Sequence, residues 1–259
     1  MFERLQKPFL TVETGEAYQP IRICYLIRQK DKLVETLNHL KCCETNSSAT
    51  SWNWFWKEEC NDLHFESLES YRRNSEHPPR LGTLTIRDNL FYINLPSFKR
   101  ACLALPFFHR LIEGMTAQAD HADFINKVFG TDERLPHGFS ELFKEDELEK
   151  IVQQRLQEYD KVQEQCENAK TPEEAFAILS EYANKESQKR LPYAERYEFQ
   201  HDKTDIDPDV VFLGFYIFLR GRELVAIRRW FGKTDFTLGN VSDEIMEKVF
   251  GDMDIDIIE

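Results

Sequence analysis

The sequence is poor in glycine: its 259 residues include only 10 Gly, and these are scattered. A phosphate-cradling loop, a dinucleotide-binding fingerprint and a nucleophile elbow all need glycines at fixed short spacings, because glycine lets the backbone turn tightly and approach a ligand closely. None of these three motifs is present. Their absence removes the commonest nucleotide-dependent enzymes and α/β-hydrolases from consideration.

Membrane and secretion signals are also lacking. The apolar run at residues 210–219 has ten residues, whereas a helix needs about 20 to cross a bilayer. The N-terminus has neither the apolar core nor the small-residue cleavage site of a secretory signal. The 6 Cys show no spacing typical of a disulfide framework, which indicates reduced thiols. We therefore expect a cytoplasmic protein with no membrane partner.

Positive charge is scarce in one half of the chain. Residues 1–130 hold 16 Lys+Arg and 16 Asp+Glu, whereas the remainder holds 17 and 30, so the net charge of −13 belongs to the second half. An acidic surface disfavours broad non-specific binding to nucleic acid. Hydrophobic residues, in contrast, are abundant: they make up 41% of the chain and include 20 Phe, enough to form a sizeable core.

Residues 210–231 dominate the hydrophobic pattern. Ten apolar residues are followed by Arg220 and Gly221 and then by a second stretch rich in β-branched and aromatic residues. A short apolar run is consistent with a strand buried on both faces, and a two-residue link containing glycine is a hairpin signal. The pattern predicts a β-hairpin that turns at Arg220-Gly221, with Arg220 and Arg222 exposed.

The first half of the chain shows alternating strand patterns. We predict strands at 21–28 and 52–57, a helix that begins near Asp31, and a hairpin over 83–95 with one apolar and one polar face. Ser97 begins a predicted helix that reaches about Ile112, which Pro106 should kink or split.

The second half is expected to be helical from about 119 to 188. Thr171, Pro172 and Glu174 form a strong helix start, with a capping residue, proline at the first helical position and glutamate three after the cap. The segments 141–167 and 171–188 should therefore form an antiparallel αα-hairpin. A strand at 194–200 and a helix near 242–250 complete the prediction.

These elements predict an α+β protein with two mixed lobes, each with an antiparallel hairpin followed by a helix, joined by a helical section that contains the αα-hairpin. The expected division is an N-terminal lobe at 1–118, a helical section at 119–190 and a C-terminal lobe at 191–259. The two lobes can share one sheet.

The acidic run at 201–209 is the first candidate site. It offers weak metal-ligand candidates, but the calcium-loop pattern fails at its glycine and its final glutamate, and the His-Asp pair lacks a companion motif. We therefore predict an acidic loop with no metal. The ligand candidates considered are His201, Asp202, Asp205 and Asp207.

Cysteines and histidines supply two further candidates. A tetrahedral zinc site would need four ligands from a set that contains no Cys-x-x-Cys spacing, so small core thiols are favoured. The ligands considered are His39, Cys42, Cys43, Cys60 and His64. Cys102 and His109 share a helix face, but two turns of helix place them about 10 Å apart, too far for an activated nucleophile.

Two groups are candidates for binding. Three tryptophans on one side of a strand could stack on a ligand, although core packing is favoured. A basic group in the acidic half could contact phosphate, although balancing the nearby aspartates is favoured. The residues are Trp52, Trp54, Trp56, Arg220, Arg222, Arg228, Arg229 and Lys233.

Our leading hypothesis is a non-catalytic adaptor, regulator or assembly factor that needs no cofactor and whose partner is another protein. The alternative is a nucleic-acid-associated or nuclease-like hydrolase that uses the arginine-rich hairpin and the acidic run from Asp202 to Asp209. A metal site built on paired carboxylates beside a basic groove would separate the two.

Overall fold

The computed structural model describes residues 8–46, 48–112, 116–136, 138–199 and 207–250. The predicted α+β class is confirmed: the strands form one antiparallel sheet of seven, in the order β2-β3-β4-β5-β1-β6-β7. The strands are β1 (Ile21–Ile27), β2 (Cys43–Thr45), β3 (Ser51–Phe55), β4 (Arg80–Arg87), β5 (Leu90–Leu95), β6 (Ala117–Ile125) and β7 (Ala194–Glu198).

The helices lie between these strands and after the last of them. They are α1 (Lys30–His39), a 3-10 turn η1 (Glu58–Cys60), α2 (Leu68–Asn74), α3 (Phe98–Ile112), α4 (Phe139–Leu142), α5 (Glu145–Glu167), α6 (Pro172–Gln188), α7 (Pro208–Trp230) and α8 (Leu238–Phe250). Pro106 lies inside α3 without ending it.

The predicted hairpin at 83–95 is confirmed as β4 and β5, with Leu84 opposite Ile93 and Thr85 opposite Tyr92. Because successive strand residues point to opposite faces, this register gives the sheet one apolar and one polar face. The buried apolar side chains of the hairpin are Leu84, Ile86, Phe91, Ile93 and Leu95.

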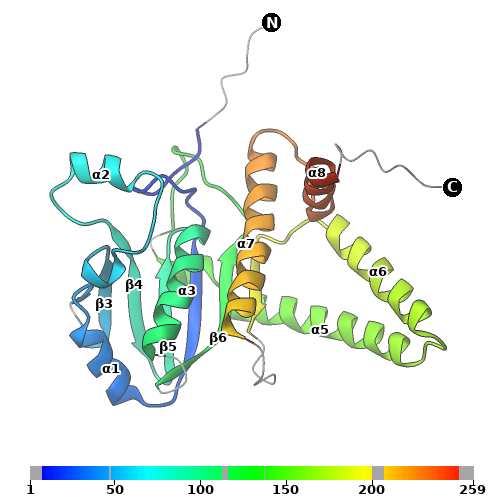
Figure 1. Ribbon diagram of the computed structural model, residues 1–259, viewed down its shortest axis with the longest axis horizontal. Helices are drawn as coiled ribbons and strands as arrows, with labels where there is room; N and C mark the ends of the chain where they lie inside the picture. Colours follow the sequence, from blue (N-terminus) through cyan, green and yellow to red (C-terminus); the bar gives the residue numbers. More distant parts are fainter. Residues whose placement is uncertain (1–7, 47, 113–115, 137, 200–206, 251–259) are drawn as a thin grey trace, which may run out of the picture. The chain divides into compact units, whose positions relative to one another are not determined.

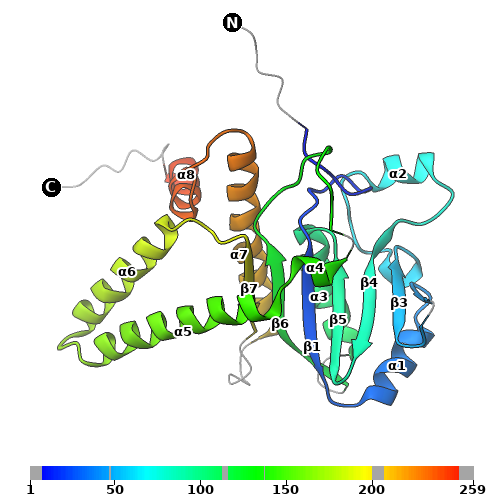
Figure 2. The same cartoon turned by 180° about the vertical axis from the view of Figure 1, so that it is seen from behind.

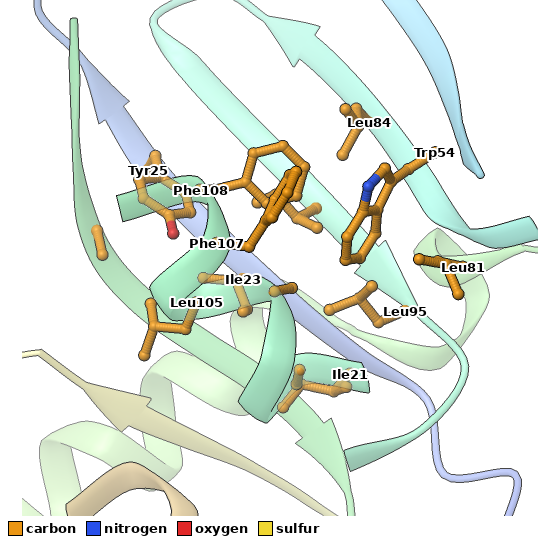
Figure 3. Packing of buried hydrophobic residues seen from close by; sticks show 14 of the residues in the cluster. Ile21, Ile23, Tyr25, Trp54, Leu81, Leu84, Leu95, Leu105, Phe107 and Phe108 are labelled. Atoms are coloured by element: carbon orange, nitrogen blue, oxygen red, sulfur yellow. The ribbon is translucent and has the colours of Figure 1, made fainter. Parts of the chain in front are cut away.

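The core lies on the apolar face. Trp54 from β3 packs against Phe107 and Phe108 of α3, with ring centroids 5.4 and 5.1 Å apart (Figure 3). Phe215 of α7 packs against Tyr197 of β7, with ring centroids 5.2 Å apart. The helices α1, α3 and the first half of α7 therefore cover this face (Figure 1).

The polar face is seen from behind, with the short helix α4 lying over it (Figure 2). Arg22 of β1 contacts α4 and lies 4.8 Å from the Phe143 ring centroid. Asp123 of β6 and Arg196 of β7 are paired in register on this face and are buried.

The prediction that residues 119–188 are helical is wrong at its start. Residues 117–125 form β6, which pairs with both β1 and β7. Three alanines and several polar residues in this stretch hid the strand, since small side chains are weak strand formers on their own. β6 is stabilised by its two neighbours rather than by local preference.

The predicted β-hairpin at 210–231 is wrong: these residues belong to the single helix α7. Its buried residues are spaced three or four apart, which is the helical period; they are Phe215, Leu219, Arg222, Val225 and Ala226. Gly221 is no turn. A Cβ atom there would lie 3.2 Å from Leu238 Cδ2 of α8, so glycine allows the two helices to approach closely.

Both ends of α7 carry ordinary helix signals. Asp207 precedes Pro208 and accepts a hydrogen bond on Oδ1 from the Asp209 amide at 3.0 Å. At the other end Gly232 adopts φ +96, and its amide donates to the Arg229 carbonyl. The Lys233 amide donates to the Arg228 carbonyl, which completes a Schellman cap.

The chain divides into two compact units. One contains Met1–Lys144 and Tyr193–Arg220, and the other contains Glu145–Pro192 and Gly221–Glu259. The three-part division at 118/119 and 190/191 stays a prediction.

Candidate functional site

The αα-hairpin is confirmed as α5 and α6, which meet at residues 168–171 (Figure 1). Thr171 Oγ1 accepts a hydrogen bond from the Glu174 amide at 3.2 Å, and Glu174 Oε2 accepts one from the Lys170 amide at 2.8 Å. These two bonds satisfy amide groups that would otherwise be unpaired at the start of α6. The cap fixes where α6 begins.

The hairpin leaves large apolar side chains in solvent. No residue of α6 is buried, and its Phe176 and Leu179 are 71% and 44% exposed. On α5, Leu156 and Tyr159 are 42% and 52% exposed. We call these four residues the hairpin apolar face.

The four residues lie on the same side of the hairpin. The other side holds a groove of about 410 Å³, to which both helices contribute. Because a helix turns about 100° per residue, Leu156 and Tyr159 point away from the groove residues Glu158 and Lys161. The same periodicity turns Phe176 away from the groove side of α6, whereas Leu179 lies at the edge between the two sides, about 60° around the helix from Tyr182. The groove residues of α6 are Ile178, Glu181, Tyr182, Lys185 and Glu186.

Ion pairs occupy the groove side. Lys189 Nζ lies 2.8 Å from Glu158 Oε2 and 2.5 Å from Glu186 Oε1. The hydrogen bonds to Glu158 and Glu186 raise the pKa of Lys189 to about 12. On the groove side, the ion pair between Lys189 and Glu158 connects α5 with the C-terminal end of α6. The hairpin apolar face lies on the other side.

Neither Phe176 nor Leu179 was identified from the sequence. The apolar stripe that marks the inside of a helix draws attention to residues facing the partner helix, such as Ile178 and Tyr182. The available signal was the second pair of apolar residues, at spacing i and i+3, outside that stripe.

The predicted basic group does not form one patch. Arg220 is exposed, as predicted. Arg222 is buried, contrary to the prediction, because residues 210–230 form a helix and not a hairpin with a turn at this point. Arg228 lies 2.9 Å from Glu244 of α8, and Lys233 lies 3.2 Å from the same carboxylate. Arg229 donates through Nε to the Phe236 carbonyl at 2.8 Å. Arg228, Arg229 and Lys233 thus make contacts that hold the C-terminal end of α7 in place.

The acidic run contributes a helix cap. Asp207 is exposed and caps α7. His201, Asp202 and Asp205 lie outside the described residues, so the metal interpretation of the run stays as predicted.

Two of the three tryptophans lie in the protein interior. Trp52 and Trp54 have no exposed surface, and their indole N–H groups donate to Asn38 Oδ1 at 2.8 Å and Cys60 Sγ at 3.1 Å. Trp56 is half-buried and donates to the Leu63 carbonyl. A ligand has no access to the faces of Trp52 and Trp54.

The structure brings three thiols together. Cys42 and Cys43 have their sulfurs 4.0 Å apart, and Cys42 also hydrogen-bonds to Cys60. These bonds lower the pKa of Cys42 below the ordinary value of a thiol. Because Cys42 has no exposed surface, it is not an accessible nucleophile.

The two histidines of the zinc hypothesis do not join these thiols. His39 is exposed, with Nδ1 2.7 Å from the Glu35 carbonyl oxygen, and His64 is exposed as well. Among the residues that the structure describes, no group of three or more His, Cys, Asp or Glu side chains is placed to hold a metal ion. As for the other thiol candidate, Cys102 is half-buried, and His109 packs against Phe212 at 5.1 Å.

A buried ion pair was not foreseen. Arg196 donates to both Asp123 oxygens, at 2.6 and 3.1 Å, and His121 Nε2 lies 3.6 Å from Asp123. Burial alone would raise the pKa of Asp123, but its bonds to His121 and Arg196 lower it below its ordinary value. Nothing local in the sequence connects Asp123 with Arg196. Their pairing follows from the β6–β7 register.

A hollow of about 600 Å³ lies at the ends of β4 and β5, near Arg100. Arg100 is fully buried and already donates to the Arg80 carbonyl at 2.7 Å and to Thr14 Oγ1 at 2.8 Å. Its guanidinium also lies 3.4 Å from Glu13. The buried cation here fastens the residues before β1 rather than offering a free charge to a ligand.

Within the described part of the chain, no helix combines the length and the apolar character needed to cross a membrane. No family model, curated protein or solved structure matches this chain. Function is therefore inferred from the placement of the residues themselves.

Proposed function

We propose that this chain works by binding another protein, as an adaptor, a regulator or an assembly factor. The observation that supports this function is the hairpin apolar face, where Phe176 is 71% exposed on a helix with no buried residue. Single exposed apolar residues are ordinary, but several on one side of an element mark a protein-binding surface.

The energetic reason is simple. Removing apolar surface from water contributes roughly 25 cal/mol per Å². Aromatic side chains in particular anchor protein interfaces, because they bring a large apolar area at a small cost in side-chain entropy. Phe176 and Tyr159 make little use of that area within the hairpin. A partner that covers them supplies the burial that α6 lacks.

The test is affinity capture from native lysate with the full chain as bait, with and without nuclease. The double variant Phe176→Ser, Leu179→Ser removes half of the hairpin apolar face. The matched control Ile245→Ser, Met246→Ser removes two side chains of α8 that are 52% and 56% exposed.

We expect a protein that the wild type and the control retain, that survives nuclease treatment and that the double variant loses. Equal retention by the double variant would show that the face is not the binding site. Loss of capture on nuclease treatment would favour nucleic acid as the partner.

A further inference from the structure

We infer that the hairpin apolar face accepts a basic amphipathic α-helix from the partner protein. This inference rests on the proposed function and names the chemistry of the partner. It is carried by the separation of apolar and charged side chains between the two sides of the hairpin.

The geometry of the face suits a helix. The face is made by two helices, and its four residues form pairs three apart along each helix, Leu156 with Tyr159 and Phe176 with Leu179. A third helix can place its own apolar stripe against such pairs, as side-chain ridges pack into grooves. A helical partner also satisfies its own backbone hydrogen bonds, so it needs only side-chain contacts from the hairpin.

The charge beside the face is negative. On α5 the exposed carboxylates Asp160 and Glu167 lie toward this side by helical periodicity. Lys161, Lys185 and Lys189 line the groove on the opposite side. Lysines placed there cannot neutralise a carboxylate-rich partner that docks on the apolar face.

The net charge of the hairpin also favours a basic partner. Residues 145–192 contain 7 Lys+Arg and 12 Asp+Glu, a net charge of −5, within a chain of net charge −13. Complementary potentials favour a basic partner and disfavour an acidic one. They also disfavour a second copy of this chain, because two acidic borders would face each other.

Three synthetic helical peptides test the inference with the full chain. They share one length and one apolar stripe and differ only in the polar face, which carries lysine, glutamate or glutamine. Binding is followed by fluorescence anisotropy at low and at high salt, and light scattering reports self-association.

We expect the lysine peptide to bind about tenfold or more tightly than the glutamate peptide at low salt, with the difference shrinking as salt screens the charges. The variant Phe176→Ser, Leu179→Ser should weaken binding of all three peptides. The variant Asp160→Asn, Glu167→Gln should weaken only the lysine peptide, by several-fold.

Two results would overturn the inference in distinguishable ways. Equal binding of the three peptides, lost in the Phe176→Ser, Leu179→Ser variant, would reject the basic partner and leave the protein-binding function standing. Failure of every peptide, or a dimer that this variant dissolves, would reject the helix as the occupant. The proposed function itself fails only if the lysate capture also shows no dependence on Phe176 and Leu179.

Discussion

The sheet and the α5–α6 hairpin treat the same kinds of residue in opposite ways. In the sheet Trp54 and Phe91 have no exposed surface, whereas in the hairpin Phe176 is 71% exposed. The difference is the number of layers around each residue. Side chains on the apolar face of the sheet are covered by α1, α3 and α7, while no layer covers the hairpin apolar face within the described part of its own unit. An aromatic residue in the sheet is buried and contributes to stability, whereas Phe176 on the hairpin is exposed.

The largest effect is expected in the layer over the sheet. Phe215→Ala should lower the free energy of unfolding by about 3–5 kcal/mol, the range for removing a buried aromatic side chain. Phe215 has no exposed surface and lies 5.2 Å, between ring centroids, from both Tyr197 and Phe199. Urea denaturation measures the change. A loss below about 1 kcal/mol would mean that the α7 contact with the sheet is not part of the core.

The polar face of the sheet provides the second test. Arg196→Met should cost about 3–5 kcal/mol at neutral pH, because Asp123 is left charged and buried without its partner. In the wild type the pKa of Asp123 is lowered, so its contribution is present above the pKa of the unfolded carboxyl and is lost as pH falls through the lower folded pKa.

In the variant Asp123 takes up a proton more readily, because burial raises its pKa and Arg196 no longer opposes this. The stability difference between wild type and variant should therefore narrow as pH is lowered from 7 toward about 4. The double variant Asp123→Leu, Arg196→Met serves as the control and should recover much of the loss. A difference that stays constant with pH would show that packing, and not charge, causes it.

In the hairpin a cap should matter more than any side-chain contact. Thr171→Ala should destabilise α6 by about 1 kcal/mol, because the Glu174 amide loses its acceptor. Hydrogen exchange of the α6 amides measures the local effect, while the amides of β1 and β5 should be unchanged. Faster exchange at both places, or no change in α6, would contradict the view of the hairpin as a locally stabilised element.

The smallest effect is expected at Phe176. Phe176→Ala should change the free energy of unfolding by no more than about 0.5 kcal/mol, since an exposed side chain has little contact to lose. Thermal denaturation alongside Phe215→Ala makes the comparison direct, with the same substitution on two helices. Similar losses at both positions would show that Phe176 is covered within the folded chain.

The sequence predicted the local elements well where pattern and terminal signals agree. Alternation over 83–95 predicted β4 and β5 with the correct inward residues, and Thr171-Pro172 predicted the start of α6. In each case the local preference and the final environment favour the same structure.

The error at α7 shows where a pattern alone is insufficient. An apolar run of ten residues fits a buried strand and a buried helix equally well, and glycine at 221 favoured a turn. The decisive signals were Asp207-Pro208 before the run and Gly232 after it, the same kind of signal that identified α6. Helix boundaries carried more information than the apolar run between them.

The hairpin apolar face was not among the predicted site residues. The sequence predicts the helical hairpin, but not the exposure of Phe176, because exposure depends on which neighbours are missing. The pairing of Asp123 with Arg196 was equally inaccessible, since it joins residues 73 positions apart through a strand register. Such long-range contacts have no local signature.

The interruption of one compact unit by residues 145–192 has a consequence for synthesis. The ribosome synthesises β1 to β6 before β7 and α7. Until β7 and α7 are made, one edge of β6 has no partner strand, and part of the apolar face of the nascent sheet is uncovered. Closing the unit across the insertion adds little entropic cost, about 0.6 kcal/mol for each doubling of loop length. The insertion therefore delays completion of the sheet during synthesis but changes the free energy of folding little. It defines an interval in which a chaperone, or a partner already bound to the emerging hairpin, meets the unfinished fold.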